Sequence, residues 1–104
     1  MRLRVHFDSP GFFLNDPRVT VRVGDRTIYD GSFKSGFDVS VELPPGRHVL
    51  ETAIDVAGLS RKQKIELPLD NTGGYRDVPE VHAKLSYSRF WGNFDKKADL
   101  SVRS

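Results

Sequence analysis

The stretch Val19-Thr20-Val21-Arg22-Val23-Gly24-Asp25-Arg26-Thr27-Ile28-Tyr29 decides the fold of this chain. Valines alternate with polar residues up to the Gly-Asp pair, and a period of two is the pattern of a half-buried β-strand. A Gly-X pair suits the two-residue type II′ turn of a hairpin. The turn predicts pairs of Val23 with Arg26, Arg22 with Thr27, and Val21 with Ile28. Val21 and Ile28 would then face inward, and Thr20 and Tyr29 outward.

The same alternation recurs along most of the chain, and no segment of helical length repeats with a period of 3.6 residues. The clearest further examples are residues 3–7, 37–43 and 81–88. Strands that are apolar on one side only are typical of antiparallel sheets with one face in water. The pattern therefore predicts an all-β chain.

Pro45-Gly46 marks a second turn, since proline followed by glycine suits the centre of a type II turn. A hairpin around this turn would pair Leu43 with His48, Val41 with Leu50, Val39 with Thr52, and Phe37 with Ile54. The apolar side would stay continuous across both strands. A slip of one residue would turn each strand inside out, so the pattern supports this register.

Two further strands complete the expected set. Residues 61–67 form a strand with Gln63, Ile65 and Leu67 inward, and a long polar connection follows over 68–79. Residues 94–102 form the last strand, with Phe94, Ala98, Leu100 and Val102 inward. We predict a single domain over residues 1–104. Its fold is an antiparallel two-sheet β-sandwich of about seven or eight strands, Ig-like or transthyretin-like.

Composition excludes several classes of function. The chain has no cysteine, which removes disulfides, thiolate zinc sites and cysteine nucleophiles. Its 16 basic and 14 acidic residues give a net charge of +2 and are interleaved, so we expect no nucleic-acid partner. No apolar run approaches the length of a membrane span, and the alternating start at Met1 is unlike a signal peptide. We therefore expect a cytoplasmic protein without membrane insertion.

Residues 18–51 carry a resemblance to a known group of modules. The matching residues are the run from Val19 to Asp25, then Tyr29-Asp30-Gly31, then Val41-Glu42-Leu43-Pro44-Pro45-Gly46-Arg47-His48. This stretch resembles the PEGA and carboxypeptidase-regulatory-like β-sandwich modules, which are relatives of transthyretin-like and Ig-like folds. The Pro-Glu-Gly-Ala string of the first group is absent here. The resemblance implies an accessory, binding or structural role and carries over no catalytic residue.

The polar residues give no pattern of a catalytic or metal site. His6, His48 and His82 have no ligand spacing; alternation places the first and last outward and His48 inward, where a hydrogen-bonded structural role is expected. Most aspartates lie at strand ends or turns, where they cap the backbone, and no calcium-loop string is present. There is also no G-x-S-x-G elbow or phosphate loop. We predict no enzyme activity, no cofactor and no metal.

Large aromatic residues in expected loops are the least ordinary feature. Phe12 and Phe13 lie in the first long connection, and Arg89, Phe90 and Trp91 lie shortly before Phe94. One interpretation is that these rings fold back and fill the open ends of the sandwich, as expected for Phe94. The other is that they form an exposed patch for a partner, with Arg89 beside Trp91 as a binding hot spot.

The leading hypothesis is a non-catalytic accessory or protein-interaction module. Its contact surface would be Arg89, Phe90 and Trp91, together with Phe12 and Phe13, or an unpaired edge strand that accepts another strand. The partner would be another protein, with a homodimer as one form. A carbohydrate-binding module that stacks sugars on the Phe90-Trp91 loop is the alternative, and a metal-dependent hydrolase ranks behind both. Lys62 and Lys64 are expected on one exposed strand face, which they would protect if it lies at a sheet edge.

Overall fold

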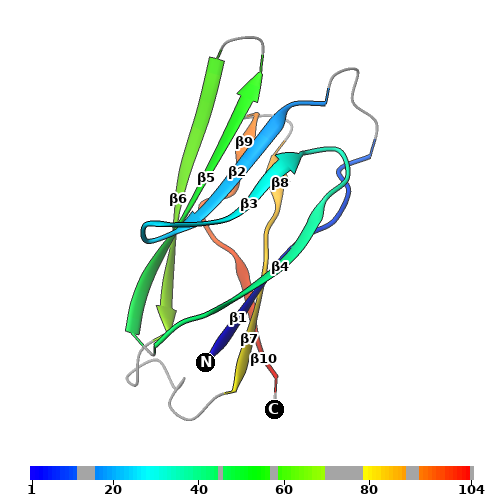
Figure 1. The fold of residues 1–104 in the computed structure, drawn as a ribbon. Coiled ribbons are helices and arrows are strands. Elements are labelled where there is room, and N and C mark those ends of the chain that lie inside the picture. The colour runs from blue at the N-terminus through cyan, green and yellow to red at the C-terminus, as the bar shows by residue number, and fades with distance from the viewer. Residues whose placement is uncertain (12–15, 45, 57–58, 70–78, 89–91, 104) are drawn as a thin grey trace.

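The computed structural model describes residues 1–11, 16–44, 46–56, 59–69, 79–88 and 92–103. All regular structure in these ranges is β (Figure 1), so no described helix could cross a membrane. The strands are β1 (Arg2–Phe7), β2 (Arg18–Val23), β3 (Arg26–Ser32), β4 (Phe37–Glu42), β5 (Gly46–Val56), β6 (Leu59–Leu69), β7 (Glu80–Lys84), β8 (Tyr87–Ser88), β9 (Asn93–Phe94) and β10 (Asp99–Arg103). The all-β prediction is confirmed for the described residues.

The strands form two four-stranded sheets and a short ribbon. Sheet A has the order β10-β7-β1-β4, sheet B has the order β3-β2-β5-β6, and β8 pairs with β9. Strands β1 and β7 run parallel, so the prediction of a purely antiparallel sandwich is wrong at the centre of sheet A. A parallel pair needs a long crossover connection, and here all of sheet B together with β4 lies between the two strands in sequence.

The β2–β3 hairpin follows the predicted register only near its turn. Gly24 has φ of 61°, a value that glycine adopts without strain, and Arg22 pairs with Thr27 as expected. Beyond this point the register shifts, so that Val21 pairs with Tyr29 and not with Ile28. The bulge lets both Ile28 and Tyr29 pack against the core, which corrects the outward prediction for Tyr29. The Tyr29 ring stacks on Phe37 with centroids 4.6 Å apart.

The turn between β3 and β4 carries the chain from sheet B to sheet A. Gly36 has φ of 68°, and a Cβ there would lie 2.5 Å from the Phe7 carbonyl oxygen, so no other residue fits without rearrangement. Asp16 accepts hydrogen bonds from Ser32 Oγ (2.6 Å) and from the Lys34 amide (3.0 Å). This is the backbone-capping role expected of a loop aspartate.

The predicted β4–β5 hairpin is wrong. Strand β4 pairs with β1 in sheet A, whereas β5 pairs with β2 and β6 in sheet B. The predicted faces are nevertheless right, because Val41 and Leu50 are both buried in the core. Alternation reports which face of a strand is covered, and two strands in facing sheets need the same alternation as two paired strands.

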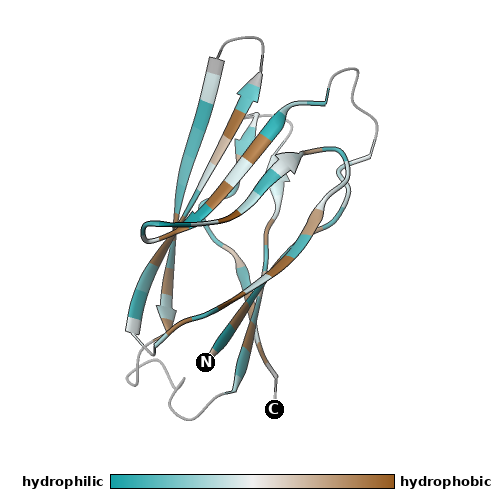
Figure 2. Cartoon of the chain, in the orientation of Figure 1, coloured by the Kyte–Doolittle hydropathy of each residue, from teal (hydrophilic) through white to brown (hydrophobic). Residues whose placement is uncertain are grey.

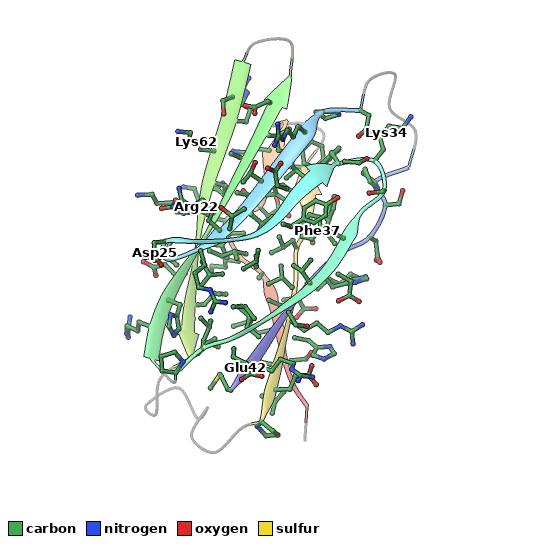
Figure 3. All side chains as sticks on the ribbon, in the orientation of Figure 1. Arg22, Asp25, Lys34, Phe37, Glu42 and Lys62 are labelled. Atoms are coloured by element: carbon green, nitrogen blue, oxygen red, sulfur yellow. The ribbon has the colours of Figure 1, made fainter. Side chains whose placement is uncertain are left out.

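Strand β6 is an edge of sheet B and is longer than predicted, since Pro68 and Leu69 continue it. Ile65 and Leu67 are buried as expected, while Gln63 is half-buried. Proline is tolerated at a sheet edge because its missing N–H faces away from the ladder. Lys62 and Lys64 are exposed, and Lys62 points away from the sheets (Figure 3), as expected of residues that protect an edge.

The predicted last strand is in fact two elements, β9 and β10. Phe94 in β9 is 2% exposed and packs edge to face on Phe7 with centroids 5.0 Å apart, so its predicted role in filling the core is confirmed. Val102 in β10 is 54% exposed, contrary to the prediction that it is buried. It lies opposite the buried Val81, but on β10, which is the edge strand of sheet A.

The core lies between the two sheets, where the inward side chains of both meet. Hydrophobic and hydrophilic residues alternate along the strands (Figure 2). Phe33, Leu3, Leu50, Ile54, Ile65 and Leu67 are among the largest side chains that are fully buried. Burial of each contributes about 1.5–3 kcal/mol to folding.

Candidate functional site

The outer face of sheet A is wholly polar in its centre, and its charges pair with one another. Arg4 Nε donates to Asp38 Oδ1 at 2.7 Å, and Lys84 Nζ lies 3.2 Å from Asp8 Oδ2. Arg2 Nε lies 3.4 Å from Glu42 Oε1. A shallow hollow of about 340 Å³ lies over this face, lined by Arg4, His6, Asp38, His82, Lys84, Asp99 and Ser101.

His6 occupies the middle of this network. Its Nε2 lies 2.6 Å from Asp8 Oδ1, and its Nδ1 lies 3.5 Å from Asp38 Oδ2. The hydrogen bond from His6, followed by Lys84, lowers the pKa of Asp8 below its ordinary value. The Arg4 guanidinium does the same to the pKa of Asp38. Carboxylates therefore lie beside both ring nitrogens of His6, an arrangement that orients the ring.

The other histidines also have structural surroundings. His48 Nε2 donates to the Pro44 carbonyl at 2.8 Å, which agrees with the predicted structural role. His82 lies on the outer face of sheet A, with Nε2 3.5 Å from Glu80 Oε1. Within the described ranges, no three histidine or acidic side chains are grouped so that they could hold a metal ion.

The predicted partner-binding residues lie outside the described part of the chain. This applies to Phe12 and Phe13 in the first connection, and to Arg89, Phe90 and Trp91 between β8 and β9. The structure therefore leaves the aromatic-patch hypothesis and the sugar-binding alternative as predictions. The described end of the β8–β9 ribbon is tied to sheet B, because Asn93 Nδ2 donates to the Lys62 carbonyl (3.0 Å) and Gln63 Nε2 to the Phe94 carbonyl (3.1 Å).

A second surface, which we term the open side, lies between the edge strand β6 of sheet B and residues 95–100, which lead into the edge strand β10 of sheet A. Two grooves follow it. The first has a volume of about 490 Å³ and is lined by Arg61, Gln63, Ser88, Asn93, Phe94, Asp95 and Lys96. The second, of about 630 Å³, is lined by Gln63, Lys64, Glu66, Pro68, Lys96, Lys97, Ala98 and Leu100. They share Gln63 and Lys96, so they meet.

The cations of the open side differ from those of sheet A. In the described residues, no carboxylate lies within ion-pair distance of Arg61, Lys64, Lys96 or Lys97. By contrast, Arg2, Arg4 and Lys84 on sheet A are each paired. Arg18 pairs with Asp30 on sheet B, with Nε 2.5 Å from Oδ1. Four cations that have no ion pair in the described residues thus line the grooves, where sequence alternation alone did not locate them. Arg22, Arg26 and Lys34 also have no ion pair there, but they do not line the grooves.

Comparison with protein-family models, with curated proteins and with solved structures finds no match for this chain.

Proposed function

We propose that this chain is a non-catalytic interaction module that binds an acidic, extended segment of another protein along its open side. Its framework would be a transthyretin-like sandwich of the kind that the PEGA-like resemblance implies. Two four-stranded sheets favour this form over the Ig-like one, because constant-type Ig sandwiches divide their strands four and three.

The separation of paired from unpaired cations carries the proposal. On sheet A, Arg2, Arg4 and Lys84 each have a carboxylate beside them, so the centre of this face has little unpaired charge to offer a ligand. Four other cations have no carboxylate partner in the described residues, namely Arg61, Lys64, Lys96 and Lys97. They line grooves whose lining also includes the apolar side chains of Ala98 and Leu100. Complementary charge raises association rates and selects partners. An extended segment with alternating acidic and apolar side chains would satisfy both features.

Protein is favoured over nucleic acid as the partner. Single-stranded nucleic acid is bound through exposed aromatic rings on which bases stack. The one aromatic ring that lines the described grooves belongs to Phe94, which is 2% exposed and already packed in the core. An acidic peptide needs no such ring.

The test uses a fluorescein-labelled peptide of alternating glutamate and valine, titrated against the protein by fluorescence anisotropy. We expect saturable binding that weakens about tenfold in Lys96→Glu/Lys97→Glu, since two favourable charges become repulsive. The matched control is Arg26→Glu/Lys34→Glu, which makes the same change in net charge away from the grooves and should bind almost as the parent does.

Three outcomes would contradict the proposal. The first is no binding at low salt, and the second is an equal loss of affinity in both double variants, which would indicate attraction to net charge alone. The third is tighter binding of a single-stranded DNA of equal length through the same two lysines, which would make the site a general polyanion groove.

A further inference from the structure

The hydrogen bonds of the neighbouring strands show which backbone groups of β10 point away from β7. The Leu85 amide donates to the His6 carbonyl (2.9 Å) and the Arg2 amide to the Pro79 carbonyl (2.9 Å), so odd-numbered residues of the β7 segment bond to β1. Even-numbered residues of β7 therefore bond to β10, where they lie opposite Asp99, Ser101 and Arg103. Because N–H and C=O alternate in direction along a strand, those of Leu100 and Val102 point outward from the sheet.

This edge lacks the protection seen on β6. Edge strands are commonly guarded by lysine or proline, and β6 has both in Lys62, Lys64 and Pro68. Strand β10 has neither in Asp99-Leu100-Ser101-Val102-Arg103. Leu100 is only partly buried, and Val102 is one of two large hydrophobic residues of the described chain that are exposed. In the described ranges no strand pairs with the outer edge of β10.

The sequence of β10 is complementary to itself when read in the opposite direction. Placed antiparallel to a second copy and centred on Ser101, the strand brings Leu100 opposite Val102 of the copy, and Asp99 opposite Arg103. Leu100 and Val102 are the residues with outward N–H and C=O groups, so this register forms hydrogen-bonded pairs between the copies. In the alternative register, the second copy is shifted by two residues, so that Lys97 lies opposite Arg103. These two residues have the same charge, which disfavours that register.

At the facing register positions of sheet A, acidic and basic residues continue in the same order across such a junction. The row through Glu42, Arg2, Glu80 and Arg103 alternates acid and base. The next row of the second copy would add Asp99, Lys84, His6 and Asp38, in that order, so that every acid has basic or histidine neighbours along eight strands. Opposite charges on facing positions stabilise neighbouring strands, and like charges destabilise them.

We propose that a second copy of this chain joins at β10, so that the two sheets A form one continuous eight-stranded sheet. The two β10 strands are antiparallel at the junction, about a two-fold axis through Ser101. The contact is isologous, since each strand offers the same residues to the other. It uses the edge of sheet A, and it does not depend on the acidic partner proposed for the grooves.

The experiment measures molecular mass by analytical ultracentrifugation over a wide range of protein concentration. We expect a monomer–dimer equilibrium whose dissociation constant rises about tenfold in Asp99→Arg and in Arg103→Asp, because each creates two like-charge pairs. The double variant Asp99→Arg/Arg103→Asp reverses both charges and should restore the parental constant. Val102→Pro removes an outward N–H and should abolish the dimer, with thermal unfolding verifying that the fold is kept.

A monomer at every concentration would overturn the inference, as would a dimer that persists in Val102→Pro. Failure of the double variant to recover the dimer would refute the proposed register. If the protein stays monomeric but binds the alternating glutamate–valine peptide and loses that binding in Val102→Pro, the edge accepts a foreign strand and the second copy is excluded. The groove variant Lys96→Glu/Lys97→Glu distinguishes the two proposals. It should lose peptide affinity if the proposed function is correct, whatever the result for the dimer.

Discussion

Thr52 lies in the middle of β5, opposite Val21 of β2 and Gln63 of β6, and is 1% exposed. Its Oγ1 is buried and makes no hydrogen bond within the described chain. A buried hydroxyl without a partner loses its hydration and gains nothing in return. Thr52 is thus the one buried polar side chain recorded in the core, at a position where the pattern of β5 calls for a hydrophobic residue.

We predict that Thr52→Val raises the free energy of unfolding by about 1 kcal/mol, because valine has nearly the same shape and no hydroxyl to desolvate. Chemical denaturation monitored by tryptophan fluorescence or circular dichroism measures the change. Thr20→Val is the control: Thr20 lies on the neighbouring strand opposite Ala53 and is only partly buried. It should change stability by less than about 0.5 kcal/mol. A less stable Thr52→Val protein would show that the hydroxyl is satisfied.

At the scale of the element, the β8–β9 ribbon is held in place mainly by the Phe94 ring. Phe94 contacts Phe7, Phe33 and Tyr87 edge to face, with centroids 5.0, 6.1 and 5.9 Å away. The ribbon has only two residues in each strand, too few to be stable alone. Its position therefore depends on this contact with the core and on the Asn93 and Gln63 hydrogen bonds to β6 and β9.

Truncation of Phe94 to alanine should lower the free energy of unfolding by about 3–5 kcal/mol, the usual cost of deleting a buried aromatic ring. The same denaturation experiment measures the loss. Val102→Ala provides the comparison, because Val102 is 54% exposed and its truncation should cost less than about 0.5 kcal/mol in the monomer. A loss below about 1 kcal/mol for Phe94→Ala would mean that the ring is not part of the core.

Elements also show what sequence alone could and could not predict. The prediction of which residues face inward is correct for β2, β4 and β5, because alternate side chains of a strand point to the same face and the sequence of each strand shows which face is apolar. Pairing was correct only near the Gly24 turn, where two residues fix the geometry. The β4–β5 pairing was wrong because facing strands and paired strands carry the same pattern. The open side escaped prediction for a related reason: it exists only once β6 and β10 are known to be edges.

For the whole molecule, the paired surface charges predict acid sensitivity. Hydrogen bonds to His6, Ser32, Arg18 and Arg4 respectively lower the pKa values of Asp8, Asp16, Asp30 and Asp38. A carboxyl whose folded pKa lies below the unfolded value of about 3.9 contributes stability above that pH and loses it as the pH falls through the folded pKa. The free energy of unfolding should therefore decline as the pH drops below about 4.

Urea unfolding at a series of pH values from neutral to about 2 would measure this decline. Asp38→Asn should make it shallower, because one of the contributing carboxyls is gone while the Arg4 side chain remains. High salt should reduce the effect, since these groups lie at the surface where screening is strong. Stability that stays level through the acid range would contradict the interpretation of these ion pairs.

The parallel contact between β1 and β7 has a consequence for the order in which the chain folds. Sheet B consists of β2, β3, β5 and β6, which come from one continuous half of the chain and include both long hairpins. The centre of sheet A, by contrast, joins the first strand to one that is synthesised only after all of sheet B. Contacts so distant along the chain form slowly. Strand β1 can pair with β4 early. A ribosome-bound chain will nevertheless carry the other edge of β1 and part of the inner face of sheet B uncovered until β7 emerges, and this interval is when it most needs protection from aggregation.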